Sequence, residues 1–168
     1  GVMGNMRANK MEGRLPLKDS ANTAVAYFND KLLAGWYMCG DLYKIDPFTL
    51  ETEGVEDFGG TMKSKAMAHV KVDEVKNEMM FFDYGPQPPF MTYGVVGSDG
   101  KVKHFTEIEL PAPRLPHDMA FSENYSILID LPMFWDPQRL KDNHHAVRFH
   151  PDMKTRFAVF PRYGNADD

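Results

Sequence analysis

Apolar residues along this chain gather in short segments, and few of them repeat with a helical spacing. The segments are rich in aromatic and β-branched side chains, and turn-forming residues such as Asn29-Asp30 and Ser98-Asp99-Gly100 lie between them. Short segments of this kind predict β-strands. The expected strands cover 24–28, 31–38, 41–46, 68–73, 77–84, 89–96, 101–110, 117–121, 125–131, 145–150 and 155–160. About eleven strands at this spacing predict an all-β sandwich, barrel or propeller.

The strand pattern repeats weakly along the chain. Asn22, His69 and His117 are separated by 47 and then 48 residues, and each precedes a short strand, a polar turn and a strongly apolar second strand. Each unit then supplies another hairpin, with expected turns at Asp46-Pro47, Ser98-Asp99-Gly100 and Pro151-Asp152. Four strands in a unit of about 40–50 residues are typical of a propeller blade.

The repeat therefore predicts about three propeller blades within residues 1–168. The approximate blade units are 22–68, 69–116 and 117–164. A closed propeller has about four blades or more, so we expect an open arc that forms part of a longer protein. An open arc exposes a blade face that closure would bury, and we expect this chain alone to aggregate.

Composition narrows the class of protein further. Apolar residues make up 43% of the 168 residues, which supports a packed core and argues against a disordered chain. The 19 basic and 24 acidic residues give a net charge of −5 without a basic stripe, so nucleic acid is not an expected partner. Cys39 is the only cysteine, which favours a reducing compartment, and we expect a cytoplasmic location.

Two of the six histidines share one register in successive units. His69 and His117 each open the first strand of a unit, and the first strands of propeller blades line the central channel, where a cation could sit. Neutral imidazole is a ligand of Fe, Zn, Cu and Ni. The alternative is that both histidines cap inner strands through hydrogen bonds, and spacing does not decide between the two. His104 alternates with its neighbours on an outer strand and is expected to be solvated.

Several segments together resemble the carotenoid cleavage oxygenase family, which includes stilbene-cleaving dioxygenases. They occur in the family's order and cover roughly residues 22–164. The segments are KLLAGWY, YKIDPFTLETEGVEDFGG, AMAHVKVD, NEMMFFDYG, PPFMTYGVVGSDGKV, ELPAPRLPHDMAFSENYSILIDLPMFWDP and TRFAVFPRYG.

The resemblance implies a seven-bladed β-propeller with non-haem Fe(II) on its axis, held by four histidines. His69 in AHVKVD is similar to the first ligand and His117 in PHDMAF to the second. The family's third and fourth ligands would lie beyond Asp168, so this chain would carry half of the iron site and bind no iron tightly by itself. No catalytic residue beyond the metal ligands is implied.

The implied activity is cleavage of an alkene C=C bond with O2, which gives two carbonyl products. The expected substrates are carotenoids, apocarotenoids or stilbene-like compounds, and such lipophilic molecules also allow peripheral contact with a membrane. The chain departs from the family where a glutamate usually orients a ligating histidine, because Tyr37 or Met38 stands there. Stilbene-cleaving members place a lysine beside that glutamate, and none occurs between Lys31 and Lys44.

Two alternatives stand beside this interpretation, and the missing glutamate motivates the first of them. The first is a non-cleaving propeller relative that binds or isomerises hydrophobic conjugated lipids. The second is an unrelated propeller that serves as an interaction platform.

Overall fold

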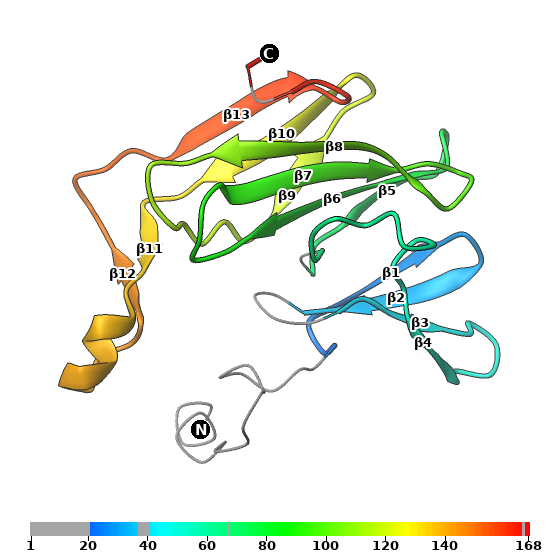
Figure 1. Cartoon of the computed structure of the whole chain (residues 1–168), viewed down its shortest axis with the longest axis horizontal. Helices are drawn as coiled ribbons and strands as arrows, with labels where there is room; N and C mark the ends of the chain where they lie inside the picture. The colour runs from blue at the N-terminus through cyan, green and yellow to red at the C-terminus, as the bar shows by residue number, and fades with distance from the viewer. Residues whose placement is uncertain (1–20, 37–40, 67, 166) are drawn as a thin grey trace.

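The computed structural model describes residues 21–36, 41–66, 68–165 and 167–168. Within these residues the chain forms thirteen β-strands and one short 3-10 helix (Figure 1). All strand pairs are antiparallel, and they build two four-stranded sheets, one three-stranded sheet and one two-stranded hairpin. No helix in the described part of the chain is long and apolar enough to cross a bilayer. The expected fold class, all-β with sheets in the manner of propeller blades, is confirmed.

The first sheet is a meander in the order β1-β2-β3-β4. The first turn holds Asn29 and Asp30 with φ of 48° and 59°, and two successive positive values favour asparagine and aspartate in a tight hairpin. In the turn between β3 and β4, the carboxylate of Asp46 accepts the backbone N–H groups of Phe48 and Thr49. The strands are β1 (Ala24–Phe28), β2 (Lys31–Gly35), β3 (Tyr43–Ile45) and β4 (Thr52–Val55).

The second sheet repeats this order as β5-β6-β7-β8. Its first turn places Asn77 at φ 49°, and its last turn places Gly100 at φ 72°, where glycine costs least. The central strand β6, with the sequence EMMFFDY, is buried on both faces, which explains the four consecutive apolar residues Met79, Met80, Phe81 and Phe82. The strands are β5 (Lys71–Asp73), β6 (Glu78–Tyr84), β7 (Phe90–Val96) and β8 (Val102–Glu109).

The third sheet has the order β9-β10-β13, and a separate hairpin projects from it. The hairpin pairs β11 with β12 and contains the 3-10 helix η1 between them. The elements are β9 (Met119–Phe121), β10 (Tyr125–Asp130), β11 (Met133–Trp135), η1 (Pro137–Asp142), β12 (Val147–Phe149) and β13 (Arg156–Pro161).

One predicted hairpin is wrong. Pro151-Asp152 was expected to join two paired strands, but β12 pairs with β11, and β13 pairs with β10. The physical reason lies at the end of β10, where Pro132 cannot donate a backbone hydrogen bond to a continuing ladder. The chain therefore leaves the sheet at Pro132, forms the β11–β12 hairpin and returns to β10 as β13.

The second sheet lies between the first and the third, so it buries both of its faces (Figure 1). We call its contact with the first sheet the first interface and its contact with the third sheet the second interface. Phe28 and Leu33 meet Met79, Phe81 and Val96 in the first interface. The core of the second interface is Met80, Phe82, Tyr84, Met91, Tyr93, Val95, Met119, Leu128 and Phe160.

Contacts between the sheets preserve the spacing of the repeat. Asn77 donates a hydrogen bond of 3.0 Å to the side-chain oxygen of Asn29, 48 residues earlier. Lys76 donates one of 3.0 Å to the carbonyl oxygen of Glu123, 47 residues later. The first hairpins of the three sheets therefore stack in one register. The blade boundaries 22–68, 69–116 and 117–164 stay a prediction.

Candidate metal centre

His69 and His117 lie two residues before β5 and β9, the first strands of the second and third sheets. The structure brings the two side chains together across 48 residues of sequence. Their Nε2 atoms are 3.2 Å apart, and their ring centroids are separated by 4.8 Å with the planes tilted by 48°. His69 is half-buried and His117 is exposed. The two imidazole nitrogens thus approach each other just before the inner strands β5 and β9.

The separation of the two Nε2 atoms suits both interpretations of the histidine pair. As a hydrogen bond it needs one ring to donate and the other to accept. Two nitrogens at about 2.0–2.1 Å from one metal ion, the length of a zinc–imidazole bond, lie about 2.8–3.4 Å apart at bond angles of about 90–110°. The observed 3.2 Å fits adjacent ligands of one ion. Among the described residues, no group of three His, Cys, Asp or Glu side chains is placed to hold a metal.

An ion pair beside the histidines joins the same two strands. Lys71 Nζ lies 2.7 Å from the Asp118 carboxylate, which also accepts the backbone N–H of Met119 at 2.7 Å. Burial would raise the pKa of Asp118, but its hydrogen bonds with Lys71 and Met119 outweigh burial and lower the pKa below its usual value. The pair therefore favours a charged Asp118 next to His117, and it ties β5 to the start of β9.

His104 does not lie free in solvent as expected. It is half-buried on β8, and its Nε2 lies 2.9 Å from the carbonyl oxygen of Gly164, in the turn after β13. His104 lies opposite Val95 on β7, on the face of the second sheet that meets the third sheet, and a pattern of alternating residues on one strand cannot reveal this contact. His150 packs its ring at 4.6 Å from the ring of Phe134. The contact of His104 links β8 to the turn after β13, and the contact of His150 packs it against β11.

The predicted departures from the family pattern have different outcomes. Tyr37, Met38 and Cys39 lie outside the described residues. Lys31 forms an ion pair of 2.6 Å with Glu53, and Lys44 lies 3.8 Å from Glu56. Both lysines therefore have carboxylate partners within the first sheet.

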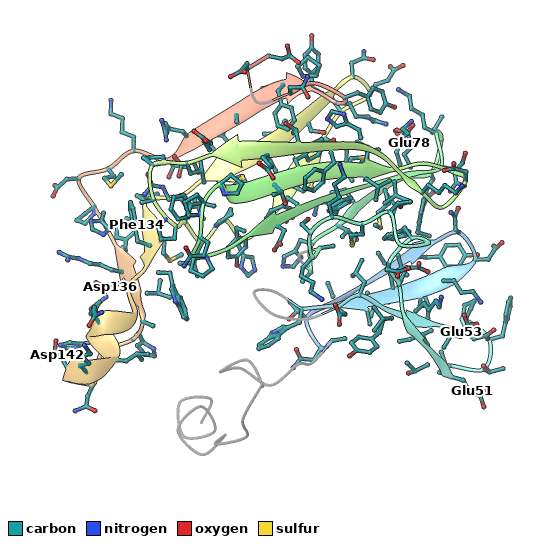
Figure 2. All side chains as sticks on the ribbon, viewed as in Figure 1. Glu51, Glu53, Glu78, Phe134, Asp136 and Asp142 are labelled. Carbon is teal, nitrogen blue, oxygen red and sulfur yellow. The ribbon has the colours of Figure 1, made fainter. Side chains whose placement is uncertain are left out.

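Sequence reasoning missed a buried ionic network in the second interface, at the end of the second sheet where β6 begins (Figure 2). Arg162 is 1% exposed, and its Nη1 lies 2.7 Å from Asp73 and 3.0 Å from Glu78. Its Nη2 donates to the carbonyl oxygen of Ser122 at 2.7 Å. Tyr163 also donates its hydroxyl to Glu78. No local sequence signal marks this network, because Arg162 follows Glu78 by 84 residues.

Hydrogen bonds to arginine change the acidity of these carboxyls. The bond with Arg162 lowers the pKa of Asp73 more than burial raises it. Burial raises the pKa of Glu78, but its bonds with Lys103, Tyr163 and Arg162 together lower it below the usual value. Both carboxylates are therefore held charged against a buried guanidinium, which locks the second and third sheets together.

The fold is thus a partial β-propeller, and the histidines of two neighbouring sheets meet at one end of the inner strands. Residues 1–168 match the family described as Retinal pigment epithelial membrane protein. The chain belongs to this family, that of the carotenoid cleavage oxygenases, and the resemblance read from its segments is confirmed.

The relatives are oxygenases. The chain is 34% identical over 181 residues to carotenoid 9,10(9′,10′)-cleavage dioxygenase 1 of Arabidopsis thaliana, with 97% of this chain and 32% of that protein covered. It is 34% identical over 148 residues to isoeugenol monooxygenase of Pseudomonas nitroreducens, with 86% and 31% covered. The chain therefore spans about a third of the length of these relatives.

Solved structures agree with these relatives. The crystal structure of lignostilbene dioxygenase from Pseudomonas brassicacearum superposes with a TM-score of 0.80 at 31% identity, covering 94% of this chain and 33% of that chain. A cobalt-substituted oxygenase of Synechocystis superposes with a TM-score of 0.72 at 25% identity, covering 90% and 34%. The chain thus shares a fold with enzymes of this family, one of which has been solved with cobalt.

Proposed function

We propose that the protein to which this chain belongs is a non-haem Fe(II) dioxygenase that cleaves an alkene C=C bond with O2. The products are two carbonyl compounds. The observation that supports this most directly is the 3.2 Å approach of His69 Nε2 and His117 Nε2, in a chain whose relatives are named cleavage dioxygenases and oxygenases. We propose these two histidines as metal ligands.

His69 and His117 would hold the iron from neighbouring inner strands. When bound, Fe(II) supplies the binding and activation of O2 next to the conjugated alkene. The histidines must be neutral to act as ligands, so metal affinity falls as the pH drops and protons compete. The Lys71–Asp118 ion pair holds the two strands at the distance that the shared site requires. The remaining ligands are proposed to come from residues beyond this chain.

The substrate is proposed as a hydrophobic molecule with a conjugated alkene. The relatives act, by name, on carotenoids, resveratrol and isoeugenol. Carotenoid, apocarotenoid and stilbene-like compounds therefore stay open, and peripheral membrane contact would follow from a lipophilic substrate. A cytoplasmic location stays a proposal that rests on the single cysteine, Cys39.

Exposed apolar side chains support the proposal that further blades cover this arc. Val25 and Tyr27 on β1 are 63% and 56% exposed, and Phe157 and Val159 on β13 are 64% and 60% exposed. These residues lie on the two end sheets, whereas both faces of the second sheet are covered. We propose that residues 22–68, 69–116 and 117–164 are three consecutive blades, and that the isolated chain aggregates through its two open faces.

The test uses the full-length protein, purified anaerobically and loaded with Fe(II). O2 consumption and product analysis are measured with a carotenoid, an apocarotenal and a hydroxylated stilbene. We expect stoichiometric iron and paired carbonyl products from one of these classes. His69→Ala and His117→Ala should lose both iron and turnover, whereas His145→Ala, at an exposed position on the β11–β12 hairpin, should keep both.

Two outcomes would contradict the proposal. Iron-loaded protein that binds a conjugated lipid but yields no cleaved carbonyl would favour the alternative, a non-cleaving binder or isomerase, which the replacement of the family's glutamate at Tyr37 or Met38 also favours. Stoichiometric iron that persists in both histidine variants would show that the metal lies elsewhere.

A further inference from the structure

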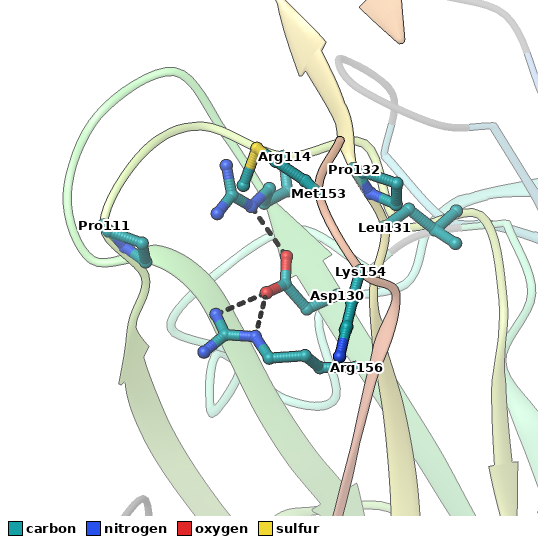
Figure 3. Close-up of a pocket in the computed structure, with 8 residues that line it drawn as sticks. All are labelled: Pro111, Arg114, Asp130, Leu131, Pro132, Met153, Lys154 and Arg156. Atoms are coloured by element: carbon teal, nitrogen blue, oxygen red, sulfur yellow. Dashed lines mark hydrogen bonds and ion pairs between the residues drawn. The ribbon is translucent and has the colours of Figure 1, made fainter. Parts of the chain in front are cut away.

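A second site lies outside the histidine pair, in an open pocket of about 330 Å³ (Figure 3). The pocket lies where the connection from β8 to β9, the end of β10 and the segment before β13 come together. Pro111 and Arg114 line it from the first segment, Asp130 from the second, and Met153 and Lys154 from the third. Arg156, the first residue of β13, completes the charged lining.

The charge of this pocket is unbalanced. Arg114, Lys154 and Arg156 are three cations, and Asp130 is the single carboxylate among the lining residues. Figure 3 shows the two arginines directed at the Asp130 carboxylate from opposite sides. Three positive charges against one negative charge leave a net charge of about +2 in a concave site, which concentrates anions.

Both oxygens of the Asp130 carboxylate already accept hydrogen bonds from the two arginines. Its Oδ1 accepts Arg114 Nε at 2.6 Å, and its Oδ2 accepts Arg156 Nε and Nη2 at 2.8 and 2.5 Å. The register of the sheet enforces the second contact, because Asp130 and Arg156 lie directly opposite each other on β10 and β13. Each carboxylate oxygen is therefore engaged before a ligand arrives.

Arg114 is left incompletely satisfied. Its side chain is 3% exposed, the ring of Phe134 covers its guanidinium carbon at 3.9 Å, and its Nη1 is buried without an acceptor among the described residues. A buried donor without an acceptor costs free energy, and a charged one costs more. Arg114 lines the pocket, so a ligand oxygen that reaches its Nη1 would supply the missing acceptor.

We propose that this pocket binds a small free carboxylate that carries an apolar body. The planar guanidinium of Arg114 matches a carboxylate, and Lys154 adds a second charge near the opening. Pro111 and Met153 provide apolar wall, and small-molecule sites combine such walls with a few convergent polar groups. A monoanion is favoured over a dianionic phosphate because less hydration is lost beside apolar walls.

The experiment titrates the full-length protein with benzoate by calorimetry or by NMR. Benzamide, which has the same shape without the charge, is the matched ligand control. We expect saturable benzoate binding that weakens as salt is added, and no binding of benzamide. Lys154→Gln and Arg114→Lys should each weaken benzoate about tenfold, the loss expected for one charge-assisted hydrogen bond.

Lys101→Gln is the matched protein control, since Lys101 is an exposed lysine in the turn between β7 and β8. It should bind benzoate as the parent does. Because Lys154 is exposed, Lys154→Gln keeps the test valid even if Arg114→Lys fails to fold. Absence of saturable benzoate binding by the parent protein would overturn the proposal. Equal affinities of Lys154→Gln and the parent, or equal binding of benzamide, would also overturn it.

Discussion

The two faces of the second sheet are built from the same four strands but use different interactions. Toward the first sheet it presents Met79, Phe81 and Val96, which pack against apolar neighbours. Toward the third sheet it presents a comparable apolar cluster together with Glu78, whose charge meets the buried Arg162. Successive side chains of a strand point to opposite faces of the sheet, so neighbouring residues of β6 belong to different interfaces. One interface is therefore held by packing, and the other by packing and a buried ionic network.

The pKa values of carboxyl groups on the two faces are shifted in opposite directions. Asp83 shares the face of Phe81, and burial raises its pKa to about 6, since backbone hydrogen bonds from Tyr84 and Lys65 compensate only in part. Asp73, on the other face, has a lowered pKa because Arg162 binds it. For Asp83, burial outweighs the backbone hydrogen bonds and the charge of Lys65, whereas for Asp73 the hydrogen bond with the Arg162 guanidinium outweighs burial.

The largest expected effect comes from removing the cation of the second interface. Arg162→Met in the full-length protein leaves buried Asp73 without its cation and Glu78 with only Lys103 and Tyr163, which costs about 3–5 kcal/mol of unfolding free energy. Urea denaturation measures this loss. Arg148→Met, at an exposed position on β12, is the control and should stay within about 0.5 kcal/mol of the parent. A small loss for Arg162→Met would mean that packing alone holds both interfaces.

Asp83 should give a pH effect in the first interface. The folded carboxyl titrates at about 6 and the unfolded one at about 3.9, so between these values the folded protein retains a proton that the unfolded chain has lost. Stability from this group is therefore present below about pH 4 and falls as the pH rises to about 6. The fall is on the order of 3 kcal/mol, since one pKa unit corresponds to about 1.4 kcal/mol.

Asp83→Asn removes the titrating group and should remove this part of the pH dependence. Denaturation of variant and parent at several pH values between 4 and 7 measures the difference. Asp142→Asn, at an exposed position in η1, is the control and should follow the parent. A difference between Asp83→Asn and the parent that does not change with pH would contradict burial as the cause.

A smaller loss is expected from overpacking the first interface. Phe81 and Gly94 are directly opposite on β6 and β7, and a methyl group on Gly94 would lie 2.4 Å from Cζ of the Phe81 ring. Gly94→Ala should therefore cost about 1–3 kcal/mol. Gly85→Ala is the matched control, because nothing lies within 4 Å of the added methyl there. Equal stability of the two variants would show that the ring moves away without cost.

The smallest effect on stability should come from the Lys71–Asp118 pair. It is partly exposed, so Asp118→Asn should change the unfolding free energy by less than about 1 kcal/mol. If the pair positions the histidines, the same variant should also weaken iron binding. The loss should be up to about fivefold in the dissociation constant, because about 1 kcal/mol corresponds to that factor. Exchanging the two residues, Lys71→Asp with Asp118→Lys, should restore affinity. Unchanged iron affinity in Asp118→Asn would show that the pair has no positioning role.

Much of the strand pattern could be predicted because the governing interactions are local. The turn at Asn29-Asp30 adopts positive φ values, and β6 combines a run of four apolar residues with burial on both faces. Strands β4 and β11 were missed. β4 has the sequence TEGV with three exposed residues, so no alternation marks it, and its place depends on pairing with β3. β11 has only three residues.

The features that could not be predicted from the sequence depend on contacts between distant segments of the chain. The pairing of β10 with β13 crosses an intervening hairpin, and nothing within either strand specifies the partner. The proximity of His69 and His117 was predictable because a repeat of 48 residues places both at the same position of neighbouring inner strands. Arg162 belongs to no such repeat, and its carboxylate partners are more than 80 residues away in the sequence.

The most direct test of the proposed centre is anomalous scattering at the iron absorption edge from crystals of the full-length, iron-loaded protein. The account predicts one strong anomalous peak within bonding distance of both His69 Nε2 and His117 Nε2, and no such peak in His117→Ala. A peak elsewhere, or two imidazole rings that still contact each other beside an iron bound by other residues, would contradict it.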